Sequence, residues 1–434
     1  MKSFDYDVFV IGGGPAGSSA ASFARKAGLK VCLAEKETFP RFHIGESLLP
    51  NGNALYKELG VWPKLESAGF IKKYGAYFFL ANGRAEKEII FAEGIVPGLE
   101  YAFQVERAKF DQILLDHSRE LGAEVHMATT VTQVQSDPEG HRLTLKNAEG
   151  ERSVTARWVI DASGRENVFT HETKRALDPS PFPKRVAIYN HFENVIRPTG
   201  PAAGHTSCVR LADGWFWMIP IDERRTSVGL VTTVEALRAA KAEPAEVFRR
   251  AVNESSKLTE MMSGAVEASA FRVTSDYSYF RRDLAKDRFI MAGDAGGFFD
   301  PIFSSGVYMA TFSAKKAVEM LVAADRKNRP LTAAECQSYG AAIKKHAGIF
   351  QKLIATFYDN DSFSIFMAER PPLKLDDAVN SVVGGHAEMP WPLWWRFKLF
   401  LFFCKFQKRY KLGRSVDFTG MNAVDPAQPA FSAK

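Results

Sequence analysis

The sequence has few cysteines and no long apolar run, and both absences narrow what the protein can be. Its 434 residues include only four cysteines, and these lack the CxxC or histidine-rich spacing that binds a metal. This usage predicts a reducing compartment and no structural metal. Because no run of about twenty apolar residues is present, we expect no membrane-spanning helix. The N-terminus carries Asp5 and Asp7 and leads directly into a strand, unlike a signal peptide, so the expected location is cytoplasmic.

The composition is that of a folded protein with more than one packed region. Hydrophobic residues make up 46% of the chain and charged residues 24%, which are ordinary values. The net charge of +6 is too mild an excess to indicate nucleic acid binding. The sequence contains no internal repeats. A chain of this length predicts two or three packed regions.

The N-terminal segment predicts a dinucleotide-binding unit. The apolar run 8–11 is followed by Gly12, Gly14 and Gly17 in the pattern GxGxxG. The first glycine permits a tight turn, the second lets backbone approach a pyrophosphate, and the third lets helix and strand pack closely. A phosphate would then lie over the helix N-terminus. Glu35 ends the next strand, at the distance expected for a carboxylate that accepts from a ribose hydroxyl.

Later segments favour FAD over NAD as the dinucleotide. WVIDASGREN (158–167) and DRFIMAGDAGGFFDPIFSSG (287–306) each begin as an apolar strand, and the second strand ends at Asp294, whose carboxylate can meet ribityl hydroxyls. With the segment 103–125, this arrangement resembles the FAD-binding family that includes aromatic hydroxylases, geranylgeranyl reductases and flavin-dependent halogenases. The resemblance covers about the first 345 residues. The residues that it assigns to FAD are Gly12, Gly14, Ala16, Gly17, Glu35, Lys36, Arg41, Ser47, Arg107, Asp294 and Gly306.

Four motifs resemble the flavin-dependent halogenases in particular. In chain order they are FPRFHIGESLLP (39–50), GFIKKYGAYF (69–78), GWFWMIP (214–220) and FFDPIFSSG (298–306). The third contains the WxWxIP pattern as Trp215, Trp217, Ile219 and Pro220. The two tryptophans alternate on one face of a strand. The resemblance implies that they form a partition between flavin and substrate, and plain core packing of their rings is the other interpretation.

The resemblance also implies a reaction. Reduced flavin and oxygen would convert a bound chloride or bromide into hypohalous acid, which halogenates an aromatic carbon. Backbone amides around Ser305 and Gly306 would bind the halide. The resemblance assigns the catalytic amine to Lys73, which would hydrogen-bond the hypohalous acid or form a haloamine, and the neighbouring Lys72 is the competing assignment.

Two departures from tryptophan-specific halogenases indicate the substrate class. This chain has Phe303 where those enzymes carry a glutamate, and it is shorter. It therefore resembles the phenol and pyrrole branch, whose electron-rich substrates are free or tethered to a carrier protein. A separate flavin reductase would supply reduced FAD, and no nucleic acid is expected. A monooxygenase or double-bond reductase of the same fold is the alternative enzyme, and a flavin protein without turnover is a third hypothesis.

The expected architecture is α/β with three parts. A Rossmann-like GxGxxG module for FAD takes 1–175 and 280–345, a mixed or antiparallel substrate-side sheet takes 176–279, and a helical region with a mobile tail takes 346–434. A helix over 391–412 is expected to pack across the substrate domain. Docking of an acidic carrier protein and contact with a membrane are the alternatives. Its expected apolar side is Trp395, Leu399, Phe402, Phe406 and Tyr410, and its basic side is Lys398, Lys405 and Arg409.

Overall fold

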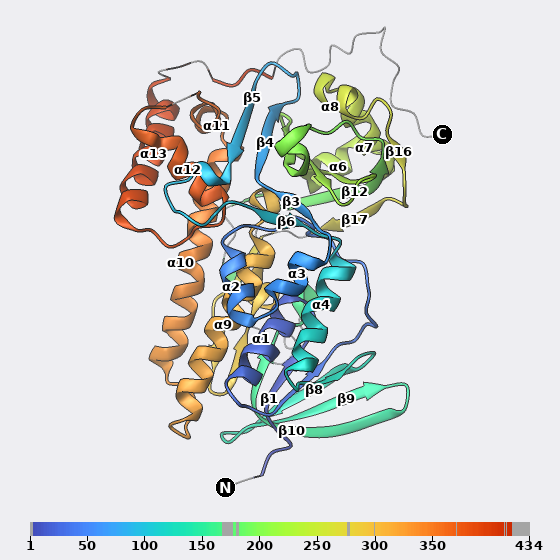
Figure 1. Cartoon of the computed structure of the whole chain (residues 1–434), viewed down its shortest axis with the longest axis vertical. Helices are drawn as coiled ribbons and strands as arrows, with labels where there is room; N and C mark the ends of the chain where they lie inside the picture. The colour runs from blue at the N-terminus through green and yellow to red at the C-terminus, as the bar shows by residue number, and fades with distance from the viewer. Residues whose placement is uncertain are drawn as a thin grey trace.

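The computed structural model describes residues 3–166, 177–178, 182–275, 278–298, 300–369, 371–411, 413 and 415–418. The expected mobile tail beyond 418 lies outside these residues. Figure 1 shows an elongated molecule, with the N-terminal strands at its lower end and the second sheet and last helices at its upper end. The helices α9 (Gly306–Asp325) and α10 (Ala333–Tyr358) run along one side between the two ends.

The first sheet brings three strand ends to one edge. β1 (Tyr6–Ile11) lies in parallel between β2 (Val31–Ala34) and β10 (Gly150–Asp161), and β20 (Phe289–Met291) pairs in parallel with β10. Ile11, Asp161 and Met291 share one register, so the loops that follow them meet at the same edge. Ligands of open α/β sheets bind at such an edge. The same sheet also contains β7 (Glu124–His126), β8 (Thr130–Ser136), β9 (His141–Asn147) and β19 (Ala285–Lys286). The helix α1 (Pro15–Lys26) contacts β1, and α4 (Arg107–Glu120) packs on α1.

Two glycines of the first loop are required by backbone contacts. Gly12 has a φ of 98°, and a Cβ there would lie 2.5 Å from the carbonyl oxygen of Ala162. A Cβ at Gly17 would overlap the carbonyl oxygen of Gly12. The turn and the close packing of α1 on β1 therefore both exclude larger residues.

The second sheet is mixed, as the sequence predicts, and it includes strands from outside the range 176–279. Two of its strands, β4 (Gly75–Leu80) and β5 (Glu86–Ile90), come from the range that the sequence assigns to the FAD module. β4 pairs in parallel with β13, a long-range pairing that no local pattern of residues 75–90 reveals. The other strands are β12 (Arg185–Glu193), β13 (Thr206–Arg210), β14 (Gly214–Pro220), β15 (Arg225–Thr233), β16 (Val266–Glu267) and β17 (Arg272–Ser275).

Short elements join and cover the two sheets. β3 (Ile71–Lys73) pairs with β6 (Ala102–Gln104), which places Lys73 opposite Ala102. One face of the second sheet is covered by a cluster in which Phe248 contacts Phe192 and Phe216. The helices not yet described are α2 (Gly52–Leu59), α3 (Trp62–Ser67), α6 (Val234–Ala240), α7 (Pro244–Asn253), α8 (Ser256–Met261), α11 (Asn360–Phe366), α12 (Leu375–Val383) and α13 (Trp391–Tyr410).

The expected helix near the C-terminus is present as α13, but its predicted apolar side is wrong in part, since Trp395, Leu399 and Phe406 are only half-buried. The helix packs on α11 and α12, and its buried residues are Leu393, Phe397, Phe400, Cys404 and Gln407. Phe402 and Tyr410 are instead 54% and 57% exposed. Because aromatic residues surround the whole helix, periodicity fits more than one face and the neighbouring helices select which is buried.

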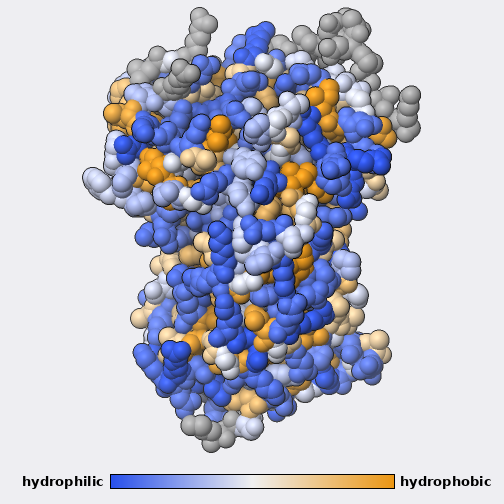
Figure 2. All heavy atoms as spheres, viewed as in Figure 1, coloured by the Kyte–Doolittle hydropathy of each residue, from blue (hydrophilic) through white to orange (hydrophobic). Residues whose placement is uncertain are grey.

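Hydrophobic residues are visible on the surface of the upper lobe, the part of the molecule that contains α13 (Figure 2). Within the described residues, no helix combines the length and the apolar character that a membrane crossing requires.

The tryptophan strand β14 packs closely against its neighbour β15. Trp215 and Trp217 are both buried on one face, with ring centroids 5.9 Å apart. Gly229 lies opposite Trp217 in the register, and a Cβ at Gly229 would overlap ring carbon Cζ2 of Trp217. The absence of a side chain on β15 therefore creates the space for the indole.

We predict that Gly229→Ala lowers the free energy of unfolding by about 1–3 kcal/mol, because the added methyl forces Trp217 out of its rotamer. Gly340→Ala is the matched control: nothing lies within 4 Å of an added Cβ there. Because Gly340 lies inside α10, helix propensity predicts a gain of about 1 kcal/mol for this control. Thermal unfolding midpoints test both variants, and a Gly229→Ala protein as stable as the parent would contradict this packing.

Candidate active site

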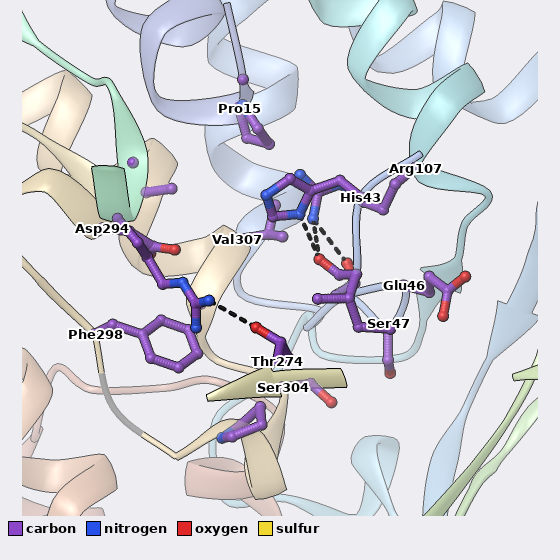
Figure 3. Close-up of a pocket in the computed structure, with 18 of the residues that line it drawn as sticks. Pro15, His43, Glu46, Ser47, Arg107, Thr274, Asp294, Phe298, Ser304 and Val307 are labelled. Atoms are coloured by element: carbon purple, nitrogen blue, oxygen red, sulfur yellow. Dashed lines mark hydrogen bonds between the residues drawn. The ribbon is translucent and has the colours of Figure 1, made fainter. Parts of the chain in front are cut away.

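A cavity of about 740 Å³ lies between the two sheets. It extends from the glycine loop at the edge of the first sheet to Trp215 and Trp217 on the second. Figure 3 shows side chains from both parts of the chain around it, with Pro15 and Asp294 from the first sheet region and Thr274 from β17. The predicted site residues that line it are Gly12, Gly14, Ala16, Glu35, Lys36, Arg41, Ser47, Arg107, Trp215, Trp217, Ile219, Asp294 and Gly306.

Some predicted site residues lie behind the cavity wall. Gly17 serves the packing of α1, Pro220 ends β14 and Ser305 is the residue before α9. Lys73 also does not line the cavity. The structure thus brings most of the predicted residues to one cavity and leaves these four adjacent to it.

The end of the cavity near β2 is organised by Glu35. Its Oε2 accepts a hydrogen bond of 2.6 Å from the backbone N–H of Gly13, and its Oε1 accepts one of 2.8 Å from Glu37. A Cβ at Gly14 would meet only Nη2 of Arg41, at 3.6 Å, so backbone is accessible at this point. The arrangement suits a ribose and a pyrophosphate above the N-terminus of α1.

Arg107 holds the segment that follows Arg41. Its guanidinium makes two hydrogen bonds to the buried Asp111, of 2.7 Å and 2.9 Å. Its Nη1 donates to the carbonyl oxygens of Ile44, at 2.9 Å, and Gly45, at 3.2 Å. The planar guanidinium of Arg107 is held in one orientation by its two hydrogen bonds to Asp111. Through this group, α4 fixes the path of residues 44–47 along the cavity.

Asp294 lies on the opposite wall, after β20. Burial raises the pKa of its carboxyl to about 6, and the positive charges of Arg165 and Arg107 oppose this rise. A desolvated carboxyl is stabilised by donors, and ribityl hydroxyls would supply them. The carbonyl oxygen of Asp294 accepts from Tyr279 Oη at 2.6 Å.

The loop before α9 bounds the cavity below Asp294. Ser304 adopts a left-handed conformation with φ 56° and ψ 24°, and α9 begins at Gly306. A Cβ at Gly306 would meet only Phe298, at 3.9 Å, and both Gly306 and Val307 at the start of α9 line the cavity. Phe303 is turned away from the cavity and contacts the aromatic rings of Phe78, Phe357 and Phe366.

The tryptophan wall is held by hydrogen bonds that the sequence analysis did not find. Trp215 Nε1 donates to Tyr358 Oη at 2.7 Å, and Tyr358 Oη donates to Asp300 at 2.6 Å. Trp217 Nε1 donates to Ser227 Oγ at 3.1 Å. Trp215 and Tyr358 are 143 positions apart, so no local signal links them. The network ties the wall to the loop that carries Ser304.

Lys73 and Lys72 have opposite environments. Lys73 is 2% exposed, and its ammonium lies 5.3 Å from the centre of the Phe91 ring. Burial lowers the pKa of Lys73 to about 7, although the nearby Cys208 opposes the change. Lys72 is exposed, with its ammonium 4.6 Å from the centre of the Tyr101 ring. Only Lys73 has a strongly perturbed environment, which is typical of a functional amine.

The residues of the cavity fit FAD. The glycine loop and Glu35 suit the adenosine and pyrophosphate, and a half-buried carboxyl at Asp294 suits the ribityl chain. The cavity then continues to the tryptophan wall, where a flat ring system would lie beside Gly306. Fold and site together define an FAD-dependent oxidoreductase.

Comparison with known proteins narrows this class. The tryptophan halogenase family model matches residues 7–87 and 80–364. The 1H-pyrrole-2-carbonyl-(peptidyl-carrier protein) chlorinase of Pseudomonas fluorescens is 34% identical over 402 residues, 87% of this chain and 88% of the relative. The flavin-dependent brominase Bmp2 has a TM-score of 0.81 at 27% identity, covering 93% of this chain and 99% of that one. The myxobacterial chondrochloren halogenase CndH has a TM-score of 0.76 at 30% identity, covering 92% and 97%.

The chain therefore belongs to the tryptophan halogenase family. It is a flavin-dependent halogenase that uses FAD and takes halide as a substrate. The predicted resemblance, the α/β fold with a mixed second sheet, and aromatic halogenation are confirmed. The roles of single residues and the division of the chain into three ranges stay predictions.

The buried amine of Lys73 predicts a pH-dependent effect on stability. Its pKa is 10.5 ordinarily and about 7 in the folded protein, so between these values the unfolded chain binds more protons. The destabilisation caused by Lys73 is therefore full below pH 7 and fades as pH rises to 10.5. Lys73→Met keeps an unbranched chain without the charge, and should raise the free energy of unfolding below pH 7 by at most about 5 kcal/mol.

Guanidinium unfolding at about pH 6 and about pH 10 measures this effect. The gain from Lys73→Met should be much smaller at the higher pH. Lys72→Met is the matched control, because an exposed amine has little effect on stability at either pH. Equal gains for Lys73→Met at both pH values would mean that the amine does not titrate with the lowered pKa.

Proposed function

We propose that this enzyme halogenates a phenol or pyrrole tethered to a carrier protein, and that Lys73 acts on the hypohalous acid. The observation that carries the lysine role is the enclosure of Lys73 beside the cavity with a pKa lowered to about 7. The tethered substrate is supported by the pyrrole-2-carbonyl carrier-protein chlorinase, which this chain matches over 88% of that enzyme's length. Phe303 supports the phenol and pyrrole class, because it stands where the tryptophan-specific halogenases carry a glutamate.

The residues would divide the work along the cavity. FAD, when bound and reduced, supplies with oxygen the oxidising equivalent that turns halide into hypohalous acid. The N-terminus of α9 at Ser305 and Gly306 would hold the halide through backbone amides. Trp215 and Trp217 would separate the flavin from the aromatic substrate, so that the diffusible hypohalous acid passes while the substrate does not reach the flavin.

Two partners and a compartment complete the proposal. A separate flavin reductase would supply the reduced FAD, as the halogenase resemblance implies. The carrier protein would present the tethered ring to the part of the cavity that Ser47, Trp215 and Trp217 border. All four cysteines are free, which supports a reducing compartment such as the cytoplasm.

A substrate panel tests the proposed function. The enzyme is supplied with a flavin reductase, NADH, FAD, oxygen and bromide or chloride, and with pyrrole-2-carbonyl and phenolic acyl groups, each both free and loaded on a carrier protein. Mass spectrometry should find a halogenated product from the carrier-loaded groups. Halogenation of the free acids at an equal rate would remove the carrier from the proposal, and hydroxylated products would favour a monooxygenase.

Substitutions at the two adjacent lysines test the amine. We predict that Lys73→Ala abolishes halogenation, with FAD binding and peroxide release within about twofold of the parent, because the amine acts after the flavin chemistry. Lys73→Arg should also be inactive, since a guanidinium does not give up its proton near neutral pH. Lys72→Ala is the matched control and should halogenate like the parent. An inactive Lys72→Ala with an active Lys73→Ala would transfer the role to Lys72.

A further inference from the structure

The lysine amine and the cavity are separated by one hydroxyl group. Lys73 Nζ donates to Ser47 Oγ at 2.9 Å and to the carbonyl oxygen of Leu48 at 3.3 Å. Ser47 lines the cavity and Lys73 does not. The ring of Phe91 lies against the ammonium on another side. The nearest route from the amine to a molecule in the cavity therefore runs through the Ser47 hydroxyl.

A second hydroxyl fixes how the protons of this route are arranged. Ser47 Oγ lies 3.1 Å from Thr206 Oγ1, and Thr206 also lines the cavity. Gln104 Nε2 donates to Thr206 Oγ1 and to the carbonyl oxygen of Gly204, both at 2.9 Å. Because a carbonyl oxygen only accepts, the Gly204 contact sets the amide so that its nitrogen, not its oxygen, faces Thr206.

The hydroxyl pair of Ser47 and Thr206 has one proton that no neighbouring side chain accepts. Ser47 and Thr206 have two hydroxyl protons, and one of them forms the hydrogen bond between the two oxygens. The ammonium form of Lys73 and the amide nitrogen of Gln104 approach this pair only as donors, so neither accepts the second proton. That proton is available on the cavity side, from Ser47 when Thr206 donates to it, and from Thr206 in the reverse arrangement. The pair thus presents one O–H donor to the cavity, backed by a buried ammonium.

We propose that Ser47 is a catalytic residue that relays a proton from Lys73 to the oxygen of hypohalous acid as the halogen is transferred; this rests on the proposed role of Lys73. The ring carbon bonds to the halogen and the halogen–oxygen bond breaks. The departing oxygen takes the Ser47 hydroxyl proton and leaves as water, while Ser47 Oγ receives a proton from the Lys73 ammonium. Loss of the ring proton from the halogenated cation then completes the substitution, and Lys73 is reprotonated.

This route accounts for the enclosure of the amine. A haloamine requires a direct nitrogen–halogen bond, but the amine is buried and meets the Ser47 hydroxyl first. A proton relay requires only the hydrogen bond that is present. Thr206 is a positioning residue in this route, because it orients the Ser47 hydroxyl and is itself held by Gln104.

Of Lys73 and the titratable groups His205 and Cys208 that face it, only Lys73 has a pKa near 7. Burial, together with the nearby charge of Lys73, lowers the pKa of His205 to about 4, so the imidazole is neutral. Burial raises the pKa of the Cys208 thiol to about 12. Glu88 carries the nearest carboxylate to His205, with its Oε1 3.6 Å from His205 Nδ1. A relay that starts from the ammonium should therefore weaken as pH rises through about 7.

Ser47→Ala and Ser47→Thr test the relay, with carrier-loaded pyrrole-2-carbonyl, bromide and reductase-supplied FAD as the assay. We predict that Ser47→Ala lowers the rate of bromination at least about 100-fold, the range of general acid catalysis. Ser47→Thr keeps the hydroxyl and should stay within about tenfold of the parent. Thr206→Val should also stay within about tenfold, because Ser47 retains its own proton.

The pH profile and FAD affinity separate a relay from a structural role. The parent and Ser47→Thr should lose bromination as pH rises through about 7, and the residual rate of Ser47→Ala should show no such inflection. The loss of bromination in Ser47→Ala should exceed any loss of FAD affinity or of peroxide release by at least about tenfold. A loss of FAD binding that accounts for the whole loss of bromination would return Ser47 to the flavin site that the sequence resemblance implies, and would overturn the relay.

The remaining outcomes distinguish this inference from the proposed function. A fully active Ser47→Ala beside an inactive Lys73→Ala would mean that the amine acts directly, which overturns the relay and leaves the role of Lys73 intact. An active Lys73→Ala would remove the proposed role of the lysine itself. Inactive Ser47→Ala and Ser47→Thr with normal FAD binding and no pH inflection in the parent would also overturn the relay.

Discussion

The desolvation of one amine constrains the region between the two sheets. Lys73 is buried, and its Nζ donates to Ser47 and Leu48. Because a buried ammonium loses its hydration, it is stabilised only where such acceptors replace the lost water. These acceptors belong to the segment whose preceding carbonyls are held by Arg107 of α4. The position of the amine thus depends on α4, the segment 44–48 and β3 together.

The far side of the cavity depends on the last helices. Tyr358, at the end of α10, receives the indole N–H of Trp215 and donates to Asp300. Phe303 packs into an aromatic cluster with Phe357 and Phe366 instead of facing the cavity. The tryptophan wall is therefore a wall of the cavity and also a part of the core, and the two interpretations that the sequence left open are compatible.

The balance of charge along the cavity follows the chemistry proposed for each part. Asp294, whose pKa is raised by burial, lies near Arg165 and Arg107 at the end suited to the flavin. The amine end contains the neutral imidazole of His205 and the neutral thiol of Cys208. Among the described residues, the hydrogen-bond partners of Lys73 are a hydroxyl and a backbone carbonyl, and neither is a carboxylate. An ammonium without a carboxylate partner gives up its proton more readily, which suits a group that donates one near neutral pH.

The sequence by itself determined the parts that depend on short-range geometry. The spacing of Gly12, Gly14 and Gly17 after an apolar strand specifies the turn, because only glycine fits where backbone atoms meet. Alternation along a strand placed Trp215 and Trp217 on one face. The wider family resemblance then predicted FAD and a mixed second sheet, and most of the site residues that the resemblance assigned line the cavity.

Tertiary structure decided what depends on residues far apart in the chain. It buried Lys73 and exposed Lys72, and it placed β4 and β5 in the second sheet through the pairing of β4 with β13. It also selected the buried face of α13. The pairing of Ser47 with Thr206 joins residues 159 positions apart, and no local pattern encodes such a contact, because it arises only when the two sheets pack together.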